Sequence, residues 1–179
     1  YRYALDERLD DTSGVTVVEL SSERDFTERV YDRTITLPDA TEMAGFDTLE
    51  LDVQLECHQG PGDCSEWDRI AAVFVCVDAT CDERRELVRW ITPYARPGRR
   101  RWAMDATPML GLLADGGERT FRVSLGPTWE EATVRDIDIS LRLSNTGAAD
   151  QSVGAELAFR GGAFSSAAAR TLRCASAST

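Results

Sequence analysis

The triplet Trp67-Asp68-Arg69 is the strongest candidate for chemistry in this sequence. It follows a cysteine-containing Gly/Pro loop and runs directly into the apolar stretch 70–77. An aspartate can act as a general base that activates water, and a neighbouring arginine can position a polar group and balance charge. A structural interpretation competes with this one, because Asp68 and Arg69 can form a simple ion pair and a tryptophan before a strand often packs into the core.

The elements around the triplet predict a β-hairpin that holds it at a strand end. Residues 70–77 form one apolar run, and residues 87–94 form a second run that ends in the turn Thr92-Pro93-Tyr94. Two such runs joined by a short polar segment are typical of paired antiparallel strands. Charged and aromatic side chains would then gather where the first strand begins and the second ends.

Period-two alternation predicts an all-β fold for the rest of the chain. In 46–56, Leu49, Leu51, Val53 and Leu55 alternate with acidic and amide residues, and 119–125 and 134–143 repeat the pattern. Further strands are expected at 15–20, 26–37, 102–104 and 153–159. Residues 96–101 are expected to form a basic turn, and the one short helix to begin at Thr107-Pro108, with threonine as its cap. The pattern predicts a single jelly roll or antiparallel β-sandwich of about eight strands.

Three segments are expected along the chain. Residues 1–14 are acidic without periodicity and predict a surface lead-in rather than an element, residues 15–160 form the jelly-roll domain, and the Gly/Ala/Ser-rich residues 161–179 form an arm or linker. The 31 acidic and 20 basic residues give a net charge of -11, which argues against a nucleic-acid partner. No apolar run approaches 18 residues, so no membrane span is expected.

The five cysteines predict disulfides and export. Cys57 with Cys64, and Cys76 with Cys81, each flank a short loop, which favours two local bridges. A zinc site would need more ligands than these spacings and the single His58 offer, so neither a metal nor a cofactor is expected. Disulfides indicate a secreted, periplasmic or cell-surface protein whose signal peptide has been removed. The odd cysteine, Cys174, is expected to hold the C-terminal arm against this domain or another copy.

A set of motifs resembles the N-terminal jelly-roll domain of the peptide-N-glycosidase F family over residues 15–159. The motifs are Cys64-x-Glu66-Trp67-Asp68-Arg69, Val73-Phe74-Val75, Arg89-x-Ile91-Thr92-Pro93-Tyr94, Asp105-x-Thr107 and Thr128-Trp129. The resemblance implies a fold of about eight antiparallel strands. It also implies an enzyme of two jelly rolls that cleaves the amide between asparagine and the first N-acetylglucosamine of an N-glycan. In that scheme Asp68 is the catalytic carboxylate, and Arg69, Trp67 and Trp129 contact substrate.

One departure from the family pattern weakens the catalytic interpretation. A second family carboxylate stands in a Glu-Thr-Trp triplet, and this chain has Pro127-Thr128-Trp129 instead. Glu130 and Glu131 are displaced by three or four residues, roughly 10 Å along a strand, too far to replace it. A further family carboxylate comes from a second jelly roll, for which the chain is too short. The catalytic set is therefore expected to be incomplete.

Three functions are compatible with these residues and motifs. The favoured one is an exported module that is noncatalytic by itself and recognises a glycan or glycoprotein, binds another protein, or acts within a larger assembly with a second jelly roll. The first alternative is a part or divergent member of a glycoasparagine amidase, supported by Trp67, Asp68 and Arg69. The second alternative is a structural surface or filament subunit, linked to other copies through Cys174.

Overall fold

Antiparallel strands account for most of the chain, as the alternation predicts. The computed structural model describes residues 2–58, 65–94, 96–129 and 133–147. Eight strands lie in this part: β1 (Val15–Phe26), β2 (Val30–Asp39), β3 (Thr48–Cys57), β4 (Ile70–Cys76), β5 (Arg84–Ile91), β6 (Gly98–Asp105), β7 (Gly116–Ser124) and β8 (Arg135–Ser144). Two α-helices, α1 (Arg2–Asp10) and α2 (Ala40–Met43), and one 3-10 helix, η1 (Thr107–Leu113), accompany them.

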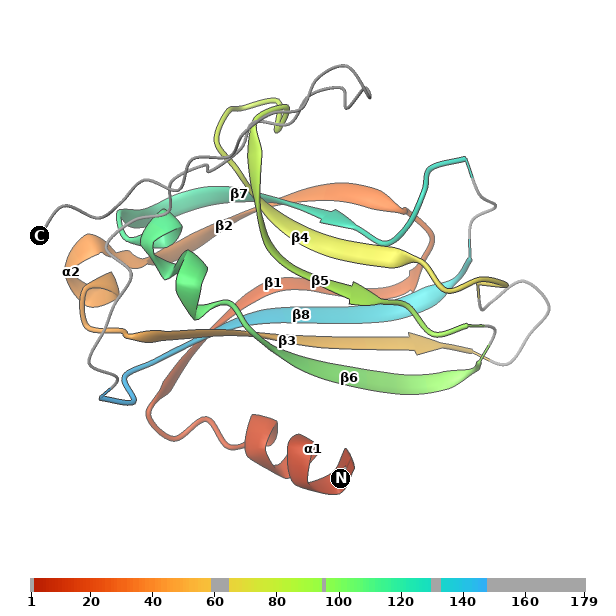
Figure 1. The fold of residues 1–179 in the computed structure, drawn as a ribbon, viewed down its shortest axis with the longest axis horizontal. Helices are drawn as coiled ribbons and strands as arrows, with labels where there is room; N and C mark the ends of the chain where they lie inside the picture. Colours follow the sequence, from red (N-terminus) through yellow and green to blue (C-terminus); the bar gives the residue numbers. More distant parts are fainter. Residues whose placement is uncertain (1, 59–64, 95, 130–132, 148–179) are drawn as a thin grey trace, which may run out of the picture.

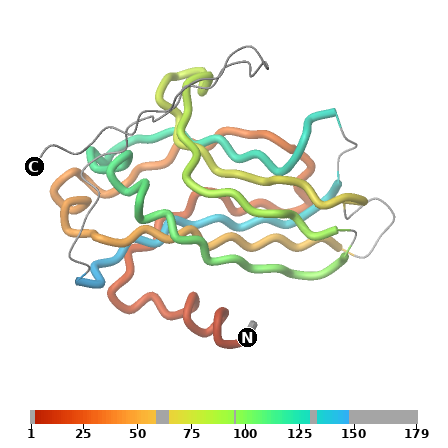
Figure 2. The backbone as a smooth tube through the Cα atoms, viewed as in Figure 1, coloured from red at the N-terminus to blue at the C-terminus, as the bar shows by residue number. Residues whose placement is uncertain are grey.

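The strands form two four-stranded sheets that face one another (Figure 1). Sheet A has the order β1-β8-β3-β6, and sheet B has the order β2-β7-β4-β5. The predicted hairpin is present, since β4 and β5 are antiparallel neighbours with Ile70 opposite Ile91 and Val73 opposite Val88. The backbone trace shows the chain passing from β7 in one sheet to β8 in the other at the end of the sandwich where β4 begins (Figure 2).

The core lies between the sheets and consists of the inward-facing residue of each alternating pair. Leu49, Leu51 and Val53 of β3 are fully buried. The same holds for the side chains predicted to face inward on the other strands: Phe121, Val123, Leu125, Ile137, Ile139, Leu141 and Leu143. Burial of apolar surface is the dominant favourable term in folding, so this double layer positions everything else.

The N-terminal segment corrects one expectation, because α1 occupies residues that were predicted to form no element. This helix has no apolar stripe, and its order comes from tertiary contacts. Leu9 is buried, and Arg142 of β8 donates hydrogen bonds to the carbonyl oxygens of Leu9 and Asp11, at 2.7 and 2.8 Å. A basic side chain that satisfies the carbonyls at a helix C-terminus stabilises the helix.

The number and type of helices also differ from the prediction. The element at Thr107-Pro108 is a 3-10 helix whose cap is Ala106. Thr107 does not cap it, because its hydroxyl accepts a hydrogen bond from the Leu49 amide at 3.1 Å. The short helix α2 was not predicted, although Asp39 and Glu42 form a complete capping box at its start.

The predicted basic turn at 96–101 is wrong for most of its length. Residues 98–101 belong to β6 rather than to a basic turn, and they pair with β3 along their whole length. Arginines are compatible with a strand here because one face of this sheet is open to solvent. The strand predicted at 153–159 and the arm at 161–179 lie outside the described residues. In the part of the chain that the structure covers, no helix is long and apolar enough to cross a membrane.

Gly116 is required where β7 begins, and its replacement is expected to be destabilising. It has a φ of +60°, and a Cβ there would stand 2.0 Å from the carbonyl oxygen of Pro38. We expect Gly116→Ala to lower the free energy of unfolding by about 2–3 kcal/mol, through the left-handed backbone and the clash together.

The adjacent Gly117 provides the matched control, because its φ is +68° but a Cβ there meets nothing within 4 Å. Gly117→Ala is expected to cost only the backbone term, about 1 kcal/mol. Chemical denaturation of both variants measures the difference, and equal losses would contradict the role assigned to the Pro38 contact.

Candidate functional site

Strand pairing fixes the backbone of Arg69 at the end of sheet B. Beyond the last ladder pair, Ile70 with Ile91, the Arg69 amide donates to the Thr92 hydroxyl at 2.9 Å. The Thr92 amide in turn donates to the Arg69 carbonyl at 2.8 Å. Thr92 is buried, so this contact is protected from water. The Thr-Pro-Tyr turn after β5 therefore anchors the triplet that precedes β4.

The Arg69 side chain packs closely against Gly126 and contacts Trp129. Gly126 has a φ of +135°, and a Cβ on it would lie 3.3 Å from Arg69 Cβ. The glycine thus lets the loop after β7 approach the arginine stem closely. Beyond this contact the guanidinium lies over the Trp129 ring, 5.6 Å from its centroid. A cation in this position is attracted to the face of the ring.

Three aromatic rings on the segments next to Arg69 and Thr92 and on the loop after β7 are open to solvent. The exposed fractions are 50% for Trp67, 48% for Tyr94 and 78% for Trp129. Trp67 and Tyr94 meet edge to face with centroids 5.8 Å apart. We call Trp67, Arg69, Tyr94 and Trp129 the aromatic–arginine cluster. Exposed rings of this size gathered at one place commonly mark a binding surface.

Asp68 lies between two members of this cluster in sequence, and it is exposed. No group among the described residues donates a hydrogen bond to its carboxylate, and Arg69 Nη1 donates to the Asp68 carbonyl oxygen, at 3.4 Å, rather than to its carboxylate. Two competing interpretations from the sequence are therefore not met in the described part of the chain: Asp68 forms no ion pair with Arg69, and Trp67 is not packed into the core. The catalytic role of Asp68 remains a prediction.

Tyr94 is the cluster member that sequence reasoning did not assign to the site. The signal was present, since Tyr94 follows the Thr92-Pro93 turn at the end of a predicted strand. Of the predicted site residues, Arg69 before β4 and Trp129 in the loop after β7 are in contact, whereas Trp67 contacts Tyr94.

One predicted disulfide is confirmed. Cys76 and Cys81 are bonded across the turn between β4 and β5, with their Cα atoms 4.7 Å apart. This bond removes the pair from any zinc site. Cys57 is disulfide-bonded as well. Its predicted partner, Cys64, and the odd Cys174 lie outside the described residues.

A second polar cluster lies at the end of sheet A, around the single histidine. His58 Nε2 is 3.2 Å from Asp136 Oδ1, and this hydrogen bond raises the pKa of His58 above its ordinary 6.5. The charges of Asp136, Asp25 and Glu56 act in the same direction. Asp136 in turn accepts a hydrogen bond from the Asp25 amide at 3.0 Å.

A histidine titration should report this cluster directly. We expect nuclear magnetic resonance to give His58 a pKa above 6.5, and Asp136→Asn to lower it. Because the folded-state value is raised, His58 stabilises the fold at pH below about 6.5, and this contribution is lost as the pH rises through the raised pKa. The stability difference between the wild type and His58→Gln should therefore shrink between pH 5 and pH 9. A difference that stays constant over this range would count against the contact.

Comparison with solved structures identifies proteins that share this fold. No protein-family model matches the sequence, and neither does any curated protein. Among solved structures, N-glycanase F (PNGase F) aligns with a TM-score of 0.52 and 22% identity, over 74% of this chain and 42% of its own. PNGF-II aligns with a TM-score of 0.58 and 12% identity, over 83% of this chain and 36% of its own. PNGase F of Flavobacterium meningosepticum, described as a glycosylasparaginase, aligns with a TM-score of 0.49 and 23% identity, over 74% of this chain and 42% of its own.

The chain therefore has a PNGase F-like jelly-roll fold, as the sequence motifs implied. At these identities the similarity concerns the fold alone. The chain spans 42% of the length of N-glycanase F and 36% of that of PNGF-II.

Proposed function

We propose that this chain is a glycan-recognising jelly-roll module of an exported protein and is not an amidase by itself. The aromatic–arginine cluster carries the proposal. Its three exposed rings offer flat apolar surfaces to the apolar faces of sugar rings, and Arg69 and Asp68 offer hydrogen bonds to hydroxyl groups. The names of the proteins with this fold, N-glycanase F and PNGF-II, point to N-linked glycans as the ligand class.

The chemistry of the cluster supports recognition over catalysis. Amide hydrolysis requires a base that activates water and further groups that stabilise the developing charge. Asp68 can supply the base, and Arg69 can supply part of the charge stabilisation. Pro127, two residues before Trp129, supplies neither a proton nor a charge at the position where the related motif has a glutamate.

An amidase of which this chain forms one part is the second candidate. The observation that favours it is the Asp68 carboxylate, which is exposed and close in sequence to an arginine that Thr92 and Gly126 hold in place. An exposed carboxylate without an internal partner among the described residues is able to accept a proton from water. Catalysis would then need acidic groups from elsewhere.

Export is part of the proposal as well. The Cys76–Cys81 disulfide supports it, because such bonds persist in oxidising compartments and are rare in the cytosol. Secretion, the periplasm and the cell surface all meet this condition.

A pair of matched ligands tests the function. The full chain is titrated by calorimetry with a peptide carrying one N-glycan, and with the same peptide after its glycan has been removed. We expect binding only of the glycosylated form, and mass spectrometry should detect no released glycan after long incubation. Release that disappears in Asp68→Ala would instead establish the amidase, and equal binding of both peptides would exclude glycan recognition.

A further inference from the structure

Three side chains with metal-binding atoms converge at the end of sheet A. They are Asp25 at the end of β1, His58 directly after β3, and Asp136 near the start of β8. One ligand atom from each lies within 4.8 Å of both others. The strands β1, β8 and β3 are immediate neighbours in the sheet, so the three residues approach from three adjacent strands.

The register explains why these residues meet. Asp136 of β8 is paired with Glu56 of β3, two residues before His58. On the other side of β8, the pairing with β1 shifts between Glu23 and Phe26, which inserts Asp25 into a bulge opposite Asp136. Asp25 has a φ of +50° in this bulge. A β-bulge redirects the side chain of the extra residue, and here it brings a carboxylate beside the imidazole.

We propose that Asp25, His58 and Asp136 bind a divalent transition-metal ion, with zinc as the best fit. One imidazole and two carboxylates form a borderline donor set, which suits zinc better than calcium or magnesium. Zinc bonds to nitrogen and oxygen are about 2 Å long, so ligands of one ion lie roughly 3–4 Å from each other. Small rotations of partly exposed side chains bring the three atoms into that range.

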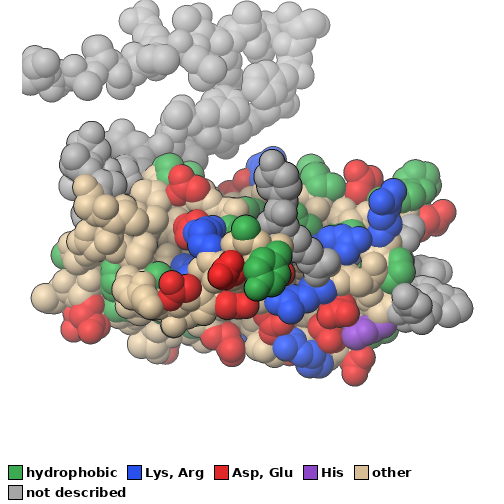
Figure 3. Space-filling model, turned by 90° about the horizontal axis from the view of Figure 1, so that it is seen from below, with side chains coloured by type: hydrophobic (Ala, Val, Ile, Leu, Met, Phe, Trp, Pro, Cys, Tyr) green, Lys and Arg blue, Asp and Glu red, His purple; other side chains and the backbone are tan. Residues whose placement is uncertain are grey.

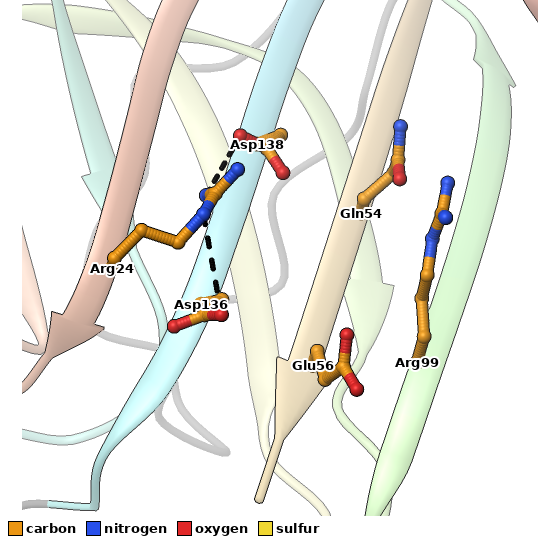
Figure 4. Close-up of a pocket in the computed structure, with 6 residues that line it drawn as sticks. All are labelled: Arg24, Gln54, Glu56, Arg99, Asp136 and Asp138. Atoms are coloured by element: carbon orange, nitrogen blue, oxygen red, sulfur yellow. Dashed lines mark hydrogen bonds and ion pairs between the residues drawn. The ribbon is translucent and has the colours of Figure 1, made fainter.

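The surroundings leave room for the remaining ligands of the ion. Asp136 also lines a polar hollow of about 150 Å³ on the outer face of sheet A, together with Arg24, Gln54, Glu56, Arg99 and Asp138 (Figure 4). Asp136 is the one proposed ligand that lines this hollow, so water or a small anion can approach the ion from the side of Asp136. A site with three protein ligands and an open position is the arrangement in which zinc activates a bound water or substrate.

Arg24, which precedes Asp25 in the sequence, is engaged mainly by another carboxylate. Arg24 Nη1 is 2.9 Å from Asp138 Oδ1, whereas Arg24 Nε stands 4.0 Å from Asp136 Oδ2. The charge of Arg24 is thus balanced mainly by Asp138, and Asp136 keeps its negative charge available. Seen from the side of α1, acidic and basic groups are interspersed over the surface (Figure 3), so a binding site here depends on local ligand geometry rather than on a broad acidic patch.

The single histidine allows a direct test on the untagged full chain. Zinc sulfate is added to protein whose free thiols have been alkylated, because Cys174 could otherwise bind the metal. We expect one equivalent to displace the imidazole proton resonances of His58 and to raise the melting temperature by roughly 5 °C at saturating zinc. Millimolar calcium or magnesium should leave both readouts unchanged.

Matched variants distinguish this site from general zinc binding by an acidic protein. His58→Ala and Asp25→Asn should each weaken binding roughly tenfold or more, since even groups that only support a ligand typically account for such factors. Glu86→Gln, which removes a carboxylate of β5 in the other sheet, should bind zinc as the wild type does. An unchanged His58 resonance at 1 mM zinc, or equal affinity of the wild type and His58→Ala, overturns the proposal.

Discussion

Replacing Asp52 by alanine is expected to lower the free energy of unfolding by about 3 kcal/mol, because the buried Arg101 guanidinium loses the carboxylate that accepts two of its hydrogen bonds. The carboxylates of Asp6 and Asp10 that remain near it are more exposed, so they compensate the buried charge only in part. Asp52 of β3 accepts two hydrogen bonds from Arg101 of β6, from Nε at 2.9 Å and from Nη2 at 2.7 Å. The side chains of Arg101 and Asp52 are only 4% and 9% exposed. The hydrogen bond to Asp52 raises the pKa of Arg101 in the wild type. A guanidinium stays protonated in a protein even without such a partner, so Arg101 cannot lose its charge in the variant.

An exposed pair on the other sheet supplies the control. Glu86 accepts two hydrogen bonds from Arg89 in the same two-pronged arrangement, but the Arg89 side chain is 63% exposed. Glu86→Ala should therefore cost much less than Asp52→Ala. Urea denaturation followed by circular dichroism measures the free energy of unfolding of both variants. Similar losses of stability in the two would contradict the role assigned to burial of the Arg101 pair.

The Asp52–Arg101 pair also connects the sheet to the N-terminal helix. The remaining guanidinium nitrogen of Arg101, Nη1, donates to Asp10 of α1 at 2.8 Å. Arg8 of the same helix pairs with Glu50 of β3 at 2.9 Å. Because α1 has no apolar stripe of its own, it depends on these charges, on Arg142 and on Leu9. Asp52→Ala should therefore also increase proteolytic cleavage within α1 relative to Glu86→Ala.

The contrast between β3 and α1 shows what the sequence could predict. The alternation of Leu49, Leu51 and Val53 records a local rule, namely that successive strand residues face opposite sides, and so it was readable without the structure. The order of α1 arises from Arg101 and Arg142, which lie far away along the chain. No local pattern records such contacts, and the segment therefore looked structureless.

The candidate sites divide in the same way. Trp67, Asp68 and Arg69 are contiguous, and their motif was visible in the sequence. The cluster of Asp25, His58 and Asp136 depends on strand order, on register and on a bulge, none of which local spacing determines. Counting histidines and cysteine spacings therefore argued against a metal site, because the carboxylate ligands come from distant strands.

Trp129 is expected to dominate glycan binding by the aromatic–arginine cluster. It is the most exposed of the three rings, at 78%, and the Arg69 guanidinium holds its other face at 5.6 Å from the ring centroid. We expect Trp129→Ala to weaken binding of an N-glycosylated peptide about tenfold, which corresponds to about 1.4 kcal/mol. The thermal stability should stay near that of the wild type, since the ring contributes little to the core.

Two further variants separate stacking from general effects of losing an aromatic surface. Tyr3 of α1 is 81% exposed and is not a member of the cluster, so Tyr3→Ala should bind as the wild type does. Arg69→Lys keeps the positive charge but loses the planar guanidinium that lies over Trp129, and it should weaken binding in the same direction as Trp129→Ala. If both Trp129→Ala and Arg69→Lys bind the glycopeptide as tightly as Tyr3→Ala does, the cluster is not the glycan site. If only Arg69→Lys loses affinity, recognition depends on hydrogen bonds from the guanidinium rather than on the tryptophan ring.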